Sequence, residues 1–176
     1  MLTKALRILG SCMTPEMAHN LRHIDAMAFA TNIDTSHTFM PHCHQLLSLD
    51  VGGTDAGDDL IRLVAAICSQ LRSLGVAATQ VTDDGMKHVA INCPQLKWLN
   101  VSNTEGEITD ESMKLVAVNC LELQSLDVSC TGERITDETM KLVGAHCVNL
   151  RSLNVSRTFG AITDDAMIWW LPTASS

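Results

Sequence analysis

The sequence predicts a single-domain α/β solenoid, in which short parallel strands line the concave side and helices cover the convex side. Three observations support this fold class. Cysteines recur at a nearly constant interval, an apolar triplet of the form L-x-x-L-x-V keeps a fixed distance from each cysteine, and a threonine lies eight residues after the first leucine of each triplet. Such self-similarity at a period of 20–50 residues is typical of proteins built from stacked repeats.

The repeats follow one another through most of the chain. The cysteines are spaced by 25, 25, 27 and 27 residues, at Cys43, Cys68, Cys93, Cys120 and Cys147. The triplets are Leu46/Leu49/Val51, Leu71/Leu74/Val76, Leu96/Leu99/Val101, Leu123/Leu126/Val128 and Leu150/Leu153/Val155. The threonines are Thr54, Thr79, Thr104, Thr131 and Thr158. The longer repeats gain their two extra residues in the link after the threonine, as expected of a surface loop.

Each repeat is expected to contain a strand, a link and a helix. The triplet places alternate side chains on one face of a short strand. After the link, apolar residues recur at helical spacing, as in Met113, Val116, Ala117 and Cys120, which predicts an amphipathic helix. A threonine before each helix is suited to cap it, and the acidic pair that follows suits the positive end of the helix dipole. We interpret the acids at the helix starts as solvated caps.

Both ends of the chain depart from the regular pattern. Residues 1–42 are expected to form degenerate N-terminal repeats or a cap, residues 43–158 the regular leucine-containing repeats, and residues 159–176 a C-terminal partial repeat and cap. Solenoids need terminal caps, so we expect Trp169 and Trp170 to cover the C-terminal end. The alternative is that a partner or a second copy of the chain covers this end.

The pattern C-x-x-L-x-x-L-x-V, followed by I-T-D and then M-x-x-V-A/G-x-x-C, resembles the cysteine-containing subclass of leucine-rich repeats. That subclass is best known from the receptor arms of F-box ubiquitin ligases. The resemblance covers Cys43 to about Trp170 and implies about six repeats that form a leucine-rich-repeat solenoid. The chain departs from the common pattern by placing threonine where asparagine is usual, and nothing upstream of the repeats resembles an F-box.

The composition limits the classes of partner and the cellular compartments that we expect for this chain. With 176 residues and 46% hydrophobic content the chain can bury a core, and no apolar run reaches the length of a membrane helix. A net charge of −8 argues against nucleic acid and anionic membranes as partners. Five of the seven cysteines lie in the repeat column, so we expect reduced, buried thiols and a cytoplasmic location. Mitochondrial and nuclear locations are the alternatives, the first because the N-terminus is free of acids.

No motif predicts catalysis or a bound cofactor. The chain contains no G-x-S-x-G, P-loop, G-x-G-x-x-G or H-E-x-x-H, the motifs that would suggest an enzyme. The histidine-containing stretch 42–44 lacks the paired spacing of zinc ligands, and so does the set of Cys12, His19 and His23. We therefore expect no metal, no cofactor and no enzymatic activity.

The residues between the core leucines are expected to point outward from the concave sheet. A first column contains Leu47, Arg72, Lys97, Gln124 and Arg151, a second Ser48, Ser73, Trp98, Ser125 and Ser152, and a third Asp50, Gly75, Asn100, Asp127 and Asn154. Trp98 stands among serines beside a cationic row, and Trp and Arg are enriched at interface hot spots. The alternative is an incidental exposed aromatic. The predicted partner-binding residues are Arg72, Lys97, Trp98, Asn100, Gln124, Asp127, Arg151 and Asn154.

These observations predict a non-catalytic protein–protein interaction module or scaffold. The resemblance extends the prediction to a substrate-recognition arm linked to ubiquitin ligation. The expected partner is another protein, with an acidic segment that faces the cationic row and an apolar anchor that packs on the indole of Trp98. The alternative is a structural subunit of a large assembly, held through the ends of its solenoid.

Overall fold

The computed structural model describes residues 22–25, 43–104 and 107–167. Six short strands in this part of the chain form one parallel sheet, in which each strand pairs with the next one along the sequence. The strands are β1 (His23–Asp25), β2 (Ser48–Asp50), β3 (Ser73–Gly75), β4 (Trp98–Asn100), β5 (Ser125–Asp127) and β6 (Ser152–Asn154). The helices are α4 (Asp58–Ile67), α5 (Asp83–Asn92), α6 (Asp110–Asn119), α7 (Asp137–His146) and α8 (Asp164–Met167).

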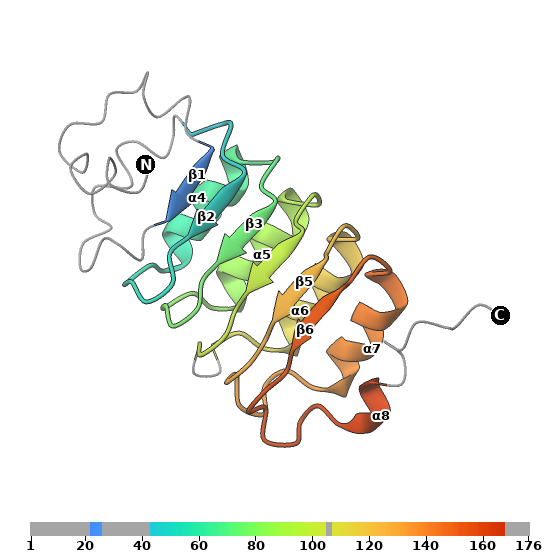
Figure 1. The fold of residues 1–176 in the computed structure, drawn as a ribbon. Helices are drawn as coiled ribbons and strands as arrows, with labels where there is room; N and C mark the ends of the chain where they lie inside the picture. The colour runs from blue at the N-terminus through green and yellow to red at the C-terminus, as the bar shows by residue number, and fades with distance from the viewer. Residues whose placement is uncertain (1–21, 26–42, 105–106, 168–176) are drawn as a thin grey trace.

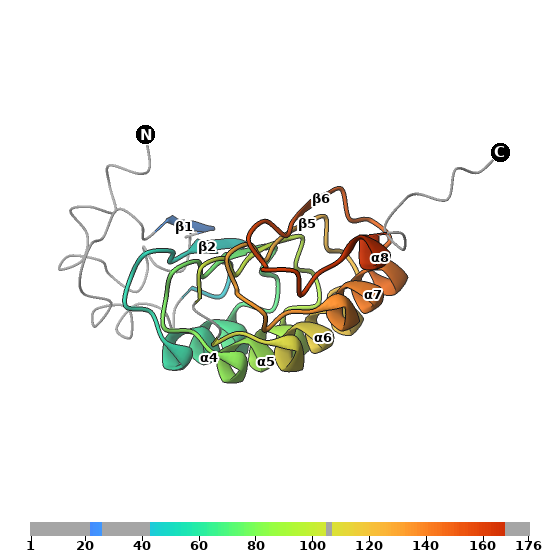
Figure 2. The ribbon, with the colours of Figure 1, turned by 90° about the horizontal axis from the view of Figure 1, so that it is seen from below.

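The strands and helices form two layers. The strands lie side by side with the helices behind them (Figure 1), and seen along the layers the sheet lies on the inner side of a shallow arc (Figure 2). This arrangement confirms the predicted α/β solenoid. No helix among the described residues is long and apolar enough to cross a membrane.

The leucines form columns that run through the whole stack. The register pairs the central residue of each strand with the central residue of the next, so that Leu49, Leu74 and Leu99 are neighbours. These side chains are buried between the sheet and the helices, whereas the residues on either side of them in the strand are mostly part-exposed. A single repeat cannot cover its own apolar side chains, so they are buried only when another repeat stacks on it.

The threonine column closes the turn that follows each strand. Each hydroxyl donates a hydrogen bond to the carbonyl oxygen of the valine three residues earlier, as in Thr79 to Val76 at 2.7 Å and Thr131 to Val128 at 2.7 Å. The residue before each threonine has a positive φ. These residues are Gly53, Ala78, Asn103, Cys130 and Arg157, with φ values of 69°, 52°, 57°, 56° and 59°. In these five turns a threonine hydroxyl, next to a residue in the left-handed conformation, stabilises the bend of the chain. This explains why threonine recurs at that position.

The cysteine column links neighbouring repeats through sulfur. The thiol of Cys68 lies 3.2 Å from the carbonyl oxygen of Cys43, and the thiol of Cys120 lies 3.6 Å from that of Cys93. All five repeat cysteines are buried, and no disulfide joins the described cysteines. Burial raises the pKa of the Cys93 thiol to about 11 and, with the neighbouring cysteines, that of Cys120 to about 12. The predicted buried, reduced column is confirmed for these residues.

In helices α4, α5, α6 and α7 the first aspartate is not simply a solvated cap, and for these four residues the sequence interpretation was wrong. Asp83 accepts two hydrogen bonds from Thr109 of the next repeat, one from its backbone N–H at 2.9 Å and one from its hydroxyl at 2.6 Å. Ser112 donates a third hydrogen bond to the same carboxylate. Asp110 receives the same set of bonds from Thr136 and Thr139. The aspartate therefore acts as a clamp between successive repeats.

The clamp recurs along the described stack. It joins Asp58 to Thr82, Asp83 to Thr109, Asp110 to Thr136 and Asp137 to Thr163. The same threonine hydroxyl also caps its own helix, since Thr109 accepts from the backbone N–H of Glu111 at 3.1 Å. One hydroxyl thus donates to the preceding repeat and accepts from its own, so the predicted capping role is confirmed and extended.

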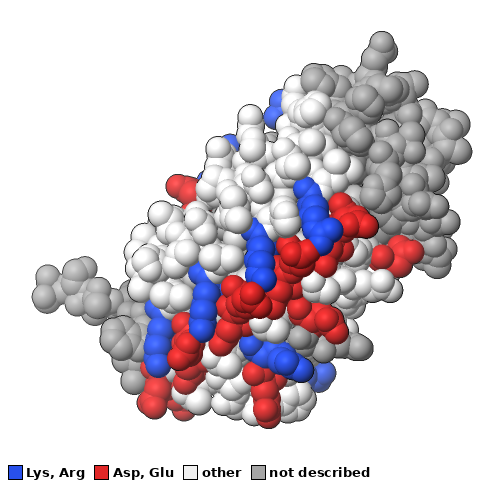
Figure 3. Space-filling model, turned by 180° about the vertical axis from the view of Figure 1, so that it is seen from behind, with Lys and Arg blue, Asp and Glu red and all other residues white. Residues whose placement is uncertain are grey.

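In helices α5, α6 and α7 the second acid lies on the surface and pairs with a basic residue of the preceding repeat. Lys87 contacts Glu111 at 2.6 Å, and Lys114 contacts Glu138 at 2.7 Å. Arg62 pairs with Asp84 in the same way. Stripes of basic and acidic side chains consequently alternate across the convex face (Figure 3). Exposed pairs of this kind contribute little stability each, so the buried columns and the clamps carry the stack.

Several predictions fall outside the described residues. The proposed cap formed by Trp169 and Trp170, the candidate ligands Cys12 and His19, and most of the N-terminal segment 1–42 lie in parts of the chain that the structure does not describe.

We expect the repeat cysteines to resist alkylation in the folded protein, because burial raises the pKa of their thiols and only the thiolate reacts. Cys130, which is only half-buried, should be modified first among the six described cysteines. Iodoacetamide labelling followed by peptide mass spectrometry measures each site. Equal labelling of Cys93 and Cys130 in native protein would contradict this expectation, and labelling in denaturant provides the fully reactive reference.

Thr109→Ala removes both the helix cap and the hydroxyl bond to Asp83. A cap alone contributes about 1 kcal/mol, and a hydrogen bond to a charged group about 1.5–3 kcal/mol. Both contributions come from the same hydroxyl and do not add fully, so we expect a loss of about 2–3 kcal/mol in the free energy of unfolding, measured by urea denaturation. Val116→Ala, which leaves a cavity in the core, should cost more. Thr109→Ser keeps the hydroxyl and is the matched control; a loss as large as that of Thr109→Ala would argue against the clamp.

The Asp83 clamp should make the stability of the folded protein depend on pH. Burial raises the pKa of Asp83, but hydrogen bonds from Ser112 and Thr109 outweigh burial, so its pKa lies below the ordinary value. A lowered folded pKa gives stability that is present above the unfolded pKa of about 3.9 and is lost as the pH falls through the folded pKa. Asp83→Asn should therefore be less stable than the wild type at pH 7, and the difference should shrink below about pH 4. Melting temperatures between pH 7 and pH 2.5 measure it, with Asp84→Asn as the control; a gap that stays constant would contradict the clamp.

Candidate functional site

The concave face carries most of the predicted partner-binding residues in the predicted columns. The first column is one continuous ladder of backbone hydrogen bonds. Lys97 N–H donates to the Arg72 carbonyl at 2.7 Å, Gln124 N–H to the Lys97 carbonyl at 2.8 Å, and Arg151 N–H to the Gln124 carbonyl at 2.8 Å. These four side chains therefore start from adjacent points on neighbouring repeats, and the structure brings them together as a row.

The cations of this row differ in how strongly they are neutralised. Arg72 and Arg151 are exposed and form no side-chain ion pair with any described residue. Lys97 lies 3.6 Å from the Glu122 carboxylate, a contact that the sequence prediction did not include. Because Glu122 lies two residues before Gln124, it could have been recognised as an acid beside the same column. The two arginines are therefore the stronger sites for an acidic partner.

Trp98 begins strand β4 and lies in register with Ser73 on one side and Ser125 on the other. Its side chain is half-buried. Its neighbours in the column are small, so the indole is the largest side chain in that row. An aromatic ring held partly out of the core by a rigid strand has the geometry of an interface anchor, because aromatic residues offer large contact area with few freely rotating bonds.

The third column has a structural role that the sequence prediction missed. Asn100 accepts a hydrogen bond from the Ser102 backbone N–H at 2.9 Å, and Asp127 accepts from the Ser129 backbone N–H at 2.9 Å. Such bonds stabilise the turn that leaves the strand. Asn154 also donates to Asp127 at 2.9 Å. The side chains of this column are therefore partly occupied within the protein, and their use by a partner stays a prediction.

The column is interrupted at Gly75. A Cβ atom at this position would collide with the Asp50 carboxylate, which lies over the glycine backbone. Asp50 also accepts a hydrogen bond from the Gly52 N–H at 3.0 Å. The Asp50 carboxylate therefore occupies the space beside Gly75, which pairs with Asn100 of strand β4.

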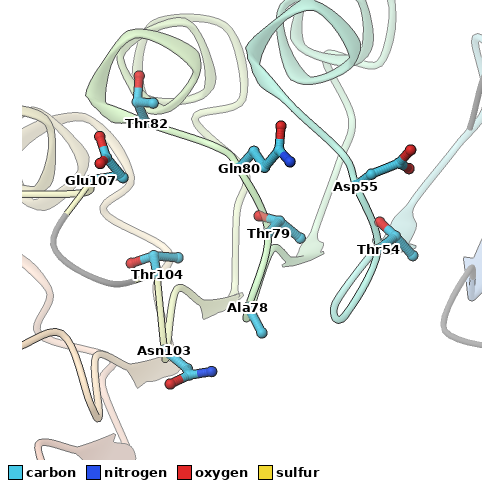
Figure 4. Close-up of a pocket in the computed structure, with 9 residues that line it drawn as sticks. All are labelled: Thr54, Asp55, Ala78, Thr79, Gln80, Thr82, Asn103, Thr104 and Glu107. Carbon is cyan, nitrogen blue, oxygen red and sulfur yellow. The ribbon is translucent and has the colours of Figure 1, made fainter. Parts of the chain in front are cut away.

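A hollow of about 590 Å³ lies beyond the ends of the strands, in the links of three successive repeats. Its lining is polar and consists of Thr54, Asp55, Ala78, Thr79, Gln80, Thr82, Asn103, Thr104 and Glu107. Asp55 and Glu107 lie at opposite ends, and Gln80 lies between them (Figure 4). Sequence analysis did not identify this hollow, since its residues are far apart in the chain and share no motif.

The described part of the chain contains no group of three or more histidine, cysteine, aspartate or glutamate side chains that could hold a metal ion. Every buried side-chain nitrogen or oxygen there has a hydrogen-bond partner. The remaining surface features around the sheet are the half-buried indole of Trp98, the cationic row beside it and the polar hollow in the links.

No protein-family model matches the sequence, and no curated protein matches it significantly. Among solved structures, the chain is similar to an internalin (inlF) from Listeria monocytogenes, with a TM-score of 0.54 and 20% sequence identity over 93% of this chain and 50% of the internalin. The chain thus spans half the length of that protein. It is also similar to a chain of the yeast Rad7 and Elc1 complex, with a TM-score of 0.47 and 14% sequence identity over 78% of this chain and 50% of that one. This likeness is too weak to support a conclusion about the fold or the function.

Internalin is a leucine-rich-repeat protein, and at this level of identity the likeness concerns the fold alone. It agrees with the parallel sheet, the leucine columns and the helices on one side of the sheet. The chain therefore has the leucine-rich-repeat fold.

Proposed function

We propose that this chain is a non-catalytic protein–protein interaction module that binds its partner through the concave sheet. The observation that carries the proposal is the half-buried Trp98, fixed in a strand among small serines and next to the exposed Arg72. The fold does not require either side chain, because the Trp98 position holds serine in the other regular repeats and the Arg72 position holds leucine, lysine or glutamine in three of them. Side chains that the fold does not need are free to serve a partner.

The partner should combine acidic residues with an apolar anchor. Arg72 and Arg151 would attract the acidic residues, and the indole of Trp98 would receive the apolar anchor. The net charge of −8 makes nucleic acid and anionic membranes unsuitable partners. The closer assignment, a substrate-recognition arm of the cysteine-containing subclass working in ubiquitin ligation in the cytoplasm, rests only on the resemblance of the repeat sequence.

Trp98→Ser tests the anchor with little risk to the fold, because serine occupies the same column in the neighbouring repeats. Hot-spot residues contribute about 2 kcal/mol or more to binding, so the affinity of the native partner should fall about 30-fold. Partners would be found by affinity purification with quantitative mass spectrometry, and their affinity measured by calorimetry. The melting temperature should hardly change. If Trp98→Ser lowers stability markedly and leaves partner affinity unchanged, the indole is structural and the site lies elsewhere.

Arg72→Glu tests the cationic row. Long-range attraction acts mainly on the rate of association, so this variant should associate more slowly, and its rate should depend less on salt than that of the wild type. Stopped-flow or surface-based kinetics at several salt concentrations would measure it. Lys141→Glu reverses an exposed charge on α7 at the convex side and is the matched control. An equal effect of both substitutions would show that only total charge matters, which contradicts a concave site.

The structural-subunit alternative is favoured by one observation. Leu150, Leu153 and Val155 are only partly buried, whereas the equivalent residues of the preceding repeats are fully buried. A second protein that stacks on β6 would cover them. Copurification of a companion that still binds Trp98→Ser but is lost on Leu153→Asp would favour this function over the concave site.

A further inference from the structure

The helices of the convex layer differ in charge between their two ends. In α4, α5, α6 and α7 the first five residues contain three charged residues each. The nine residues that follow in each repeat contain one charged residue in all four repeats together, Glu122. We call the exposed side chains of these stretches, residues 63–71, 88–96, 115–123 and 142–150, the helix-exit surface. An uncharged area adjoins the row of basic side chains on this face (Figure 3).

Large apolar side chains are exposed on the helix-exit surface. Five large apolar residues are exposed in the described part of the chain, and four of them lie here: Ile91 at 66%, Val118 at 38%, Leu121 at 49% and Val148 at 80%. Ile91 and Val118 occupy the same position near the ends of α5 and α6, and Leu121 and Val148 each follow the column cysteine of successive repeats. Single exposed apolar residues are ordinary, whereas a group of them marks an interaction site.

Stacking does not require these four side chains. Alanine occupies the position of Ile91 in α4 and α7, and serine occupies the position of Leu121 in the repeat that contains α4. The helices α4 and α7 are nevertheless joined to the following repeat by the same aspartate–threonine clamp. Since the fold uses smaller residues equally well at these positions, the exposed apolar side chains need another explanation, and contact with a partner provides one.

The electrostatics of the helix-exit surface favour a basic partner. The last turns of α4, α5 and α6 contain no basic residue, so no cation of the same helix offsets the partial negative charge of its C-terminus. Glu122 is exposed and pairs with Lys97 at 3.6 Å. The whole chain has a net charge of −8, which attracts basic proteins at long range and disfavours a second copy of the same chain.

The dimensions of the surface suit a single helix of a partner. Neighbouring helices pack about 8–10 Å apart, so the four apolar side chains, which extend from α5 to the repeat of α7, span about 20 Å. This is the length of a helix of about 13 residues. A standard interface between two folded proteins takes about 20–30 residues from each side, whereas the helix-exit surface has 16 exposed residues.

We propose that the helix-exit surface binds a basic amphipathic helix of another protein. Apolar side chains on one face of that helix contact the apolar group centred on Val118 and Leu121, as in other complexes in which a helix is recognised by its apolar face. Lysine or arginine residues at the margins of the bound helix lie over the helix C-termini and near Glu122. Trp98 lies in the sheet, outside this surface, so one chain can bind two proteins at once.

The test is an NMR titration of the labelled full chain with the amphipathic peptide acetyl-Lys-Leu-Leu-Lys-Lys-Leu-Leu-Lys-Lys-Leu-Leu-Lys-amide. This basic peptide should give saturable shifts at the amides of Ile91, Val118 and Leu121. A scrambled peptide of the same composition, without an apolar helical face, should bind about tenfold more weakly or less. The same amphipathic peptide with glutamate in place of lysine should also bind more weakly than the basic one.

The double variant I91Q/L121Q replaces two exposed apolar side chains by polar ones of similar size. Its melting temperature should stay unchanged, while its affinity for the basic peptide should fall about tenfold. Phe159→Gln is the matched control, because Phe159 is 77% exposed but lies outside the helix-exit surface, and it should leave the affinity unchanged. Trp98→Ser should leave it unchanged as well, because the indole belongs to the concave face.

An unchanged affinity in I91Q/L121Q, an equal loss in Phe159→Gln, or equal binding of the scrambled peptide would each overturn the proposal. Tighter binding of the glutamate peptide would overturn the assignment of a basic partner. Sedimentation of the chain alone tests for a second copy, since a dimer that I91Q/L121Q abolishes would assign the surface to self-association instead. If Trp98→Ser retains full affinity for the native partner while the basic peptide still binds at Ile91, the concave-face function fails and the helix-exit site stands.

Discussion

The stack depends on a hydrogen-bonded aspartate–threonine pair that joins successive repeats at four junctions of the described chain. Asp83 lies at the start of one helix and holds both the N–H and the hydroxyl of Thr109, which caps the following helix. The contact therefore fixes the position of two helices at once, at the point where the link delivers the chain to the convex layer. Together with the strand ladder on the other side, it sets the spacing of the repeats and leaves little freedom in their register.

The side chains that hold the stack together determine which surface positions can be substituted without loss of stability. The buried columns, the cysteine thiols and the clamp aspartates all serve stacking, and a change in any of them affects the neighbouring repeats. The convex face is covered by ion pairs between successive helices. The first two outward columns of the strands carry fewer such obligations than the third column, whose Asn100 and Asp127 stabilise turns. A side chain in these two columns can therefore change with little loss of stability, and Trp98 lies in one of them.

The sequence predicts the periodic features well, because each of them repeats and each can be recognised from its own residue type. The leucine, cysteine and threonine columns belong to this class. The role of Asp83 was missed because its bonding partners, Thr109 and Ser112, lie 26 and 29 residues away in the chain, and only the register of the stack brings them together. The turns at Asn100 and Asp127 were within reach, because both begin an Asn/Asp-x-Ser sequence that favours a side-chain-to-backbone bond. The hollow was not, because its lining residues come from three separate links and share no motif.

In a periodic structure the exceptions to the period are informative. A residue that follows its column is explained by stacking, whereas one that departs from it needs another reason. Trp98 departs from a column of serines, and Gly75 departs from a column of aspartate and asparagine. Both departures lie on the adjacent strands β3 and β4. The Asp50 carboxylate, which occupies the space beside Gly75, accounts for the glycine. Stacking gives no such account of the indole, and this is the argument for placing the proposed binding site at Trp98.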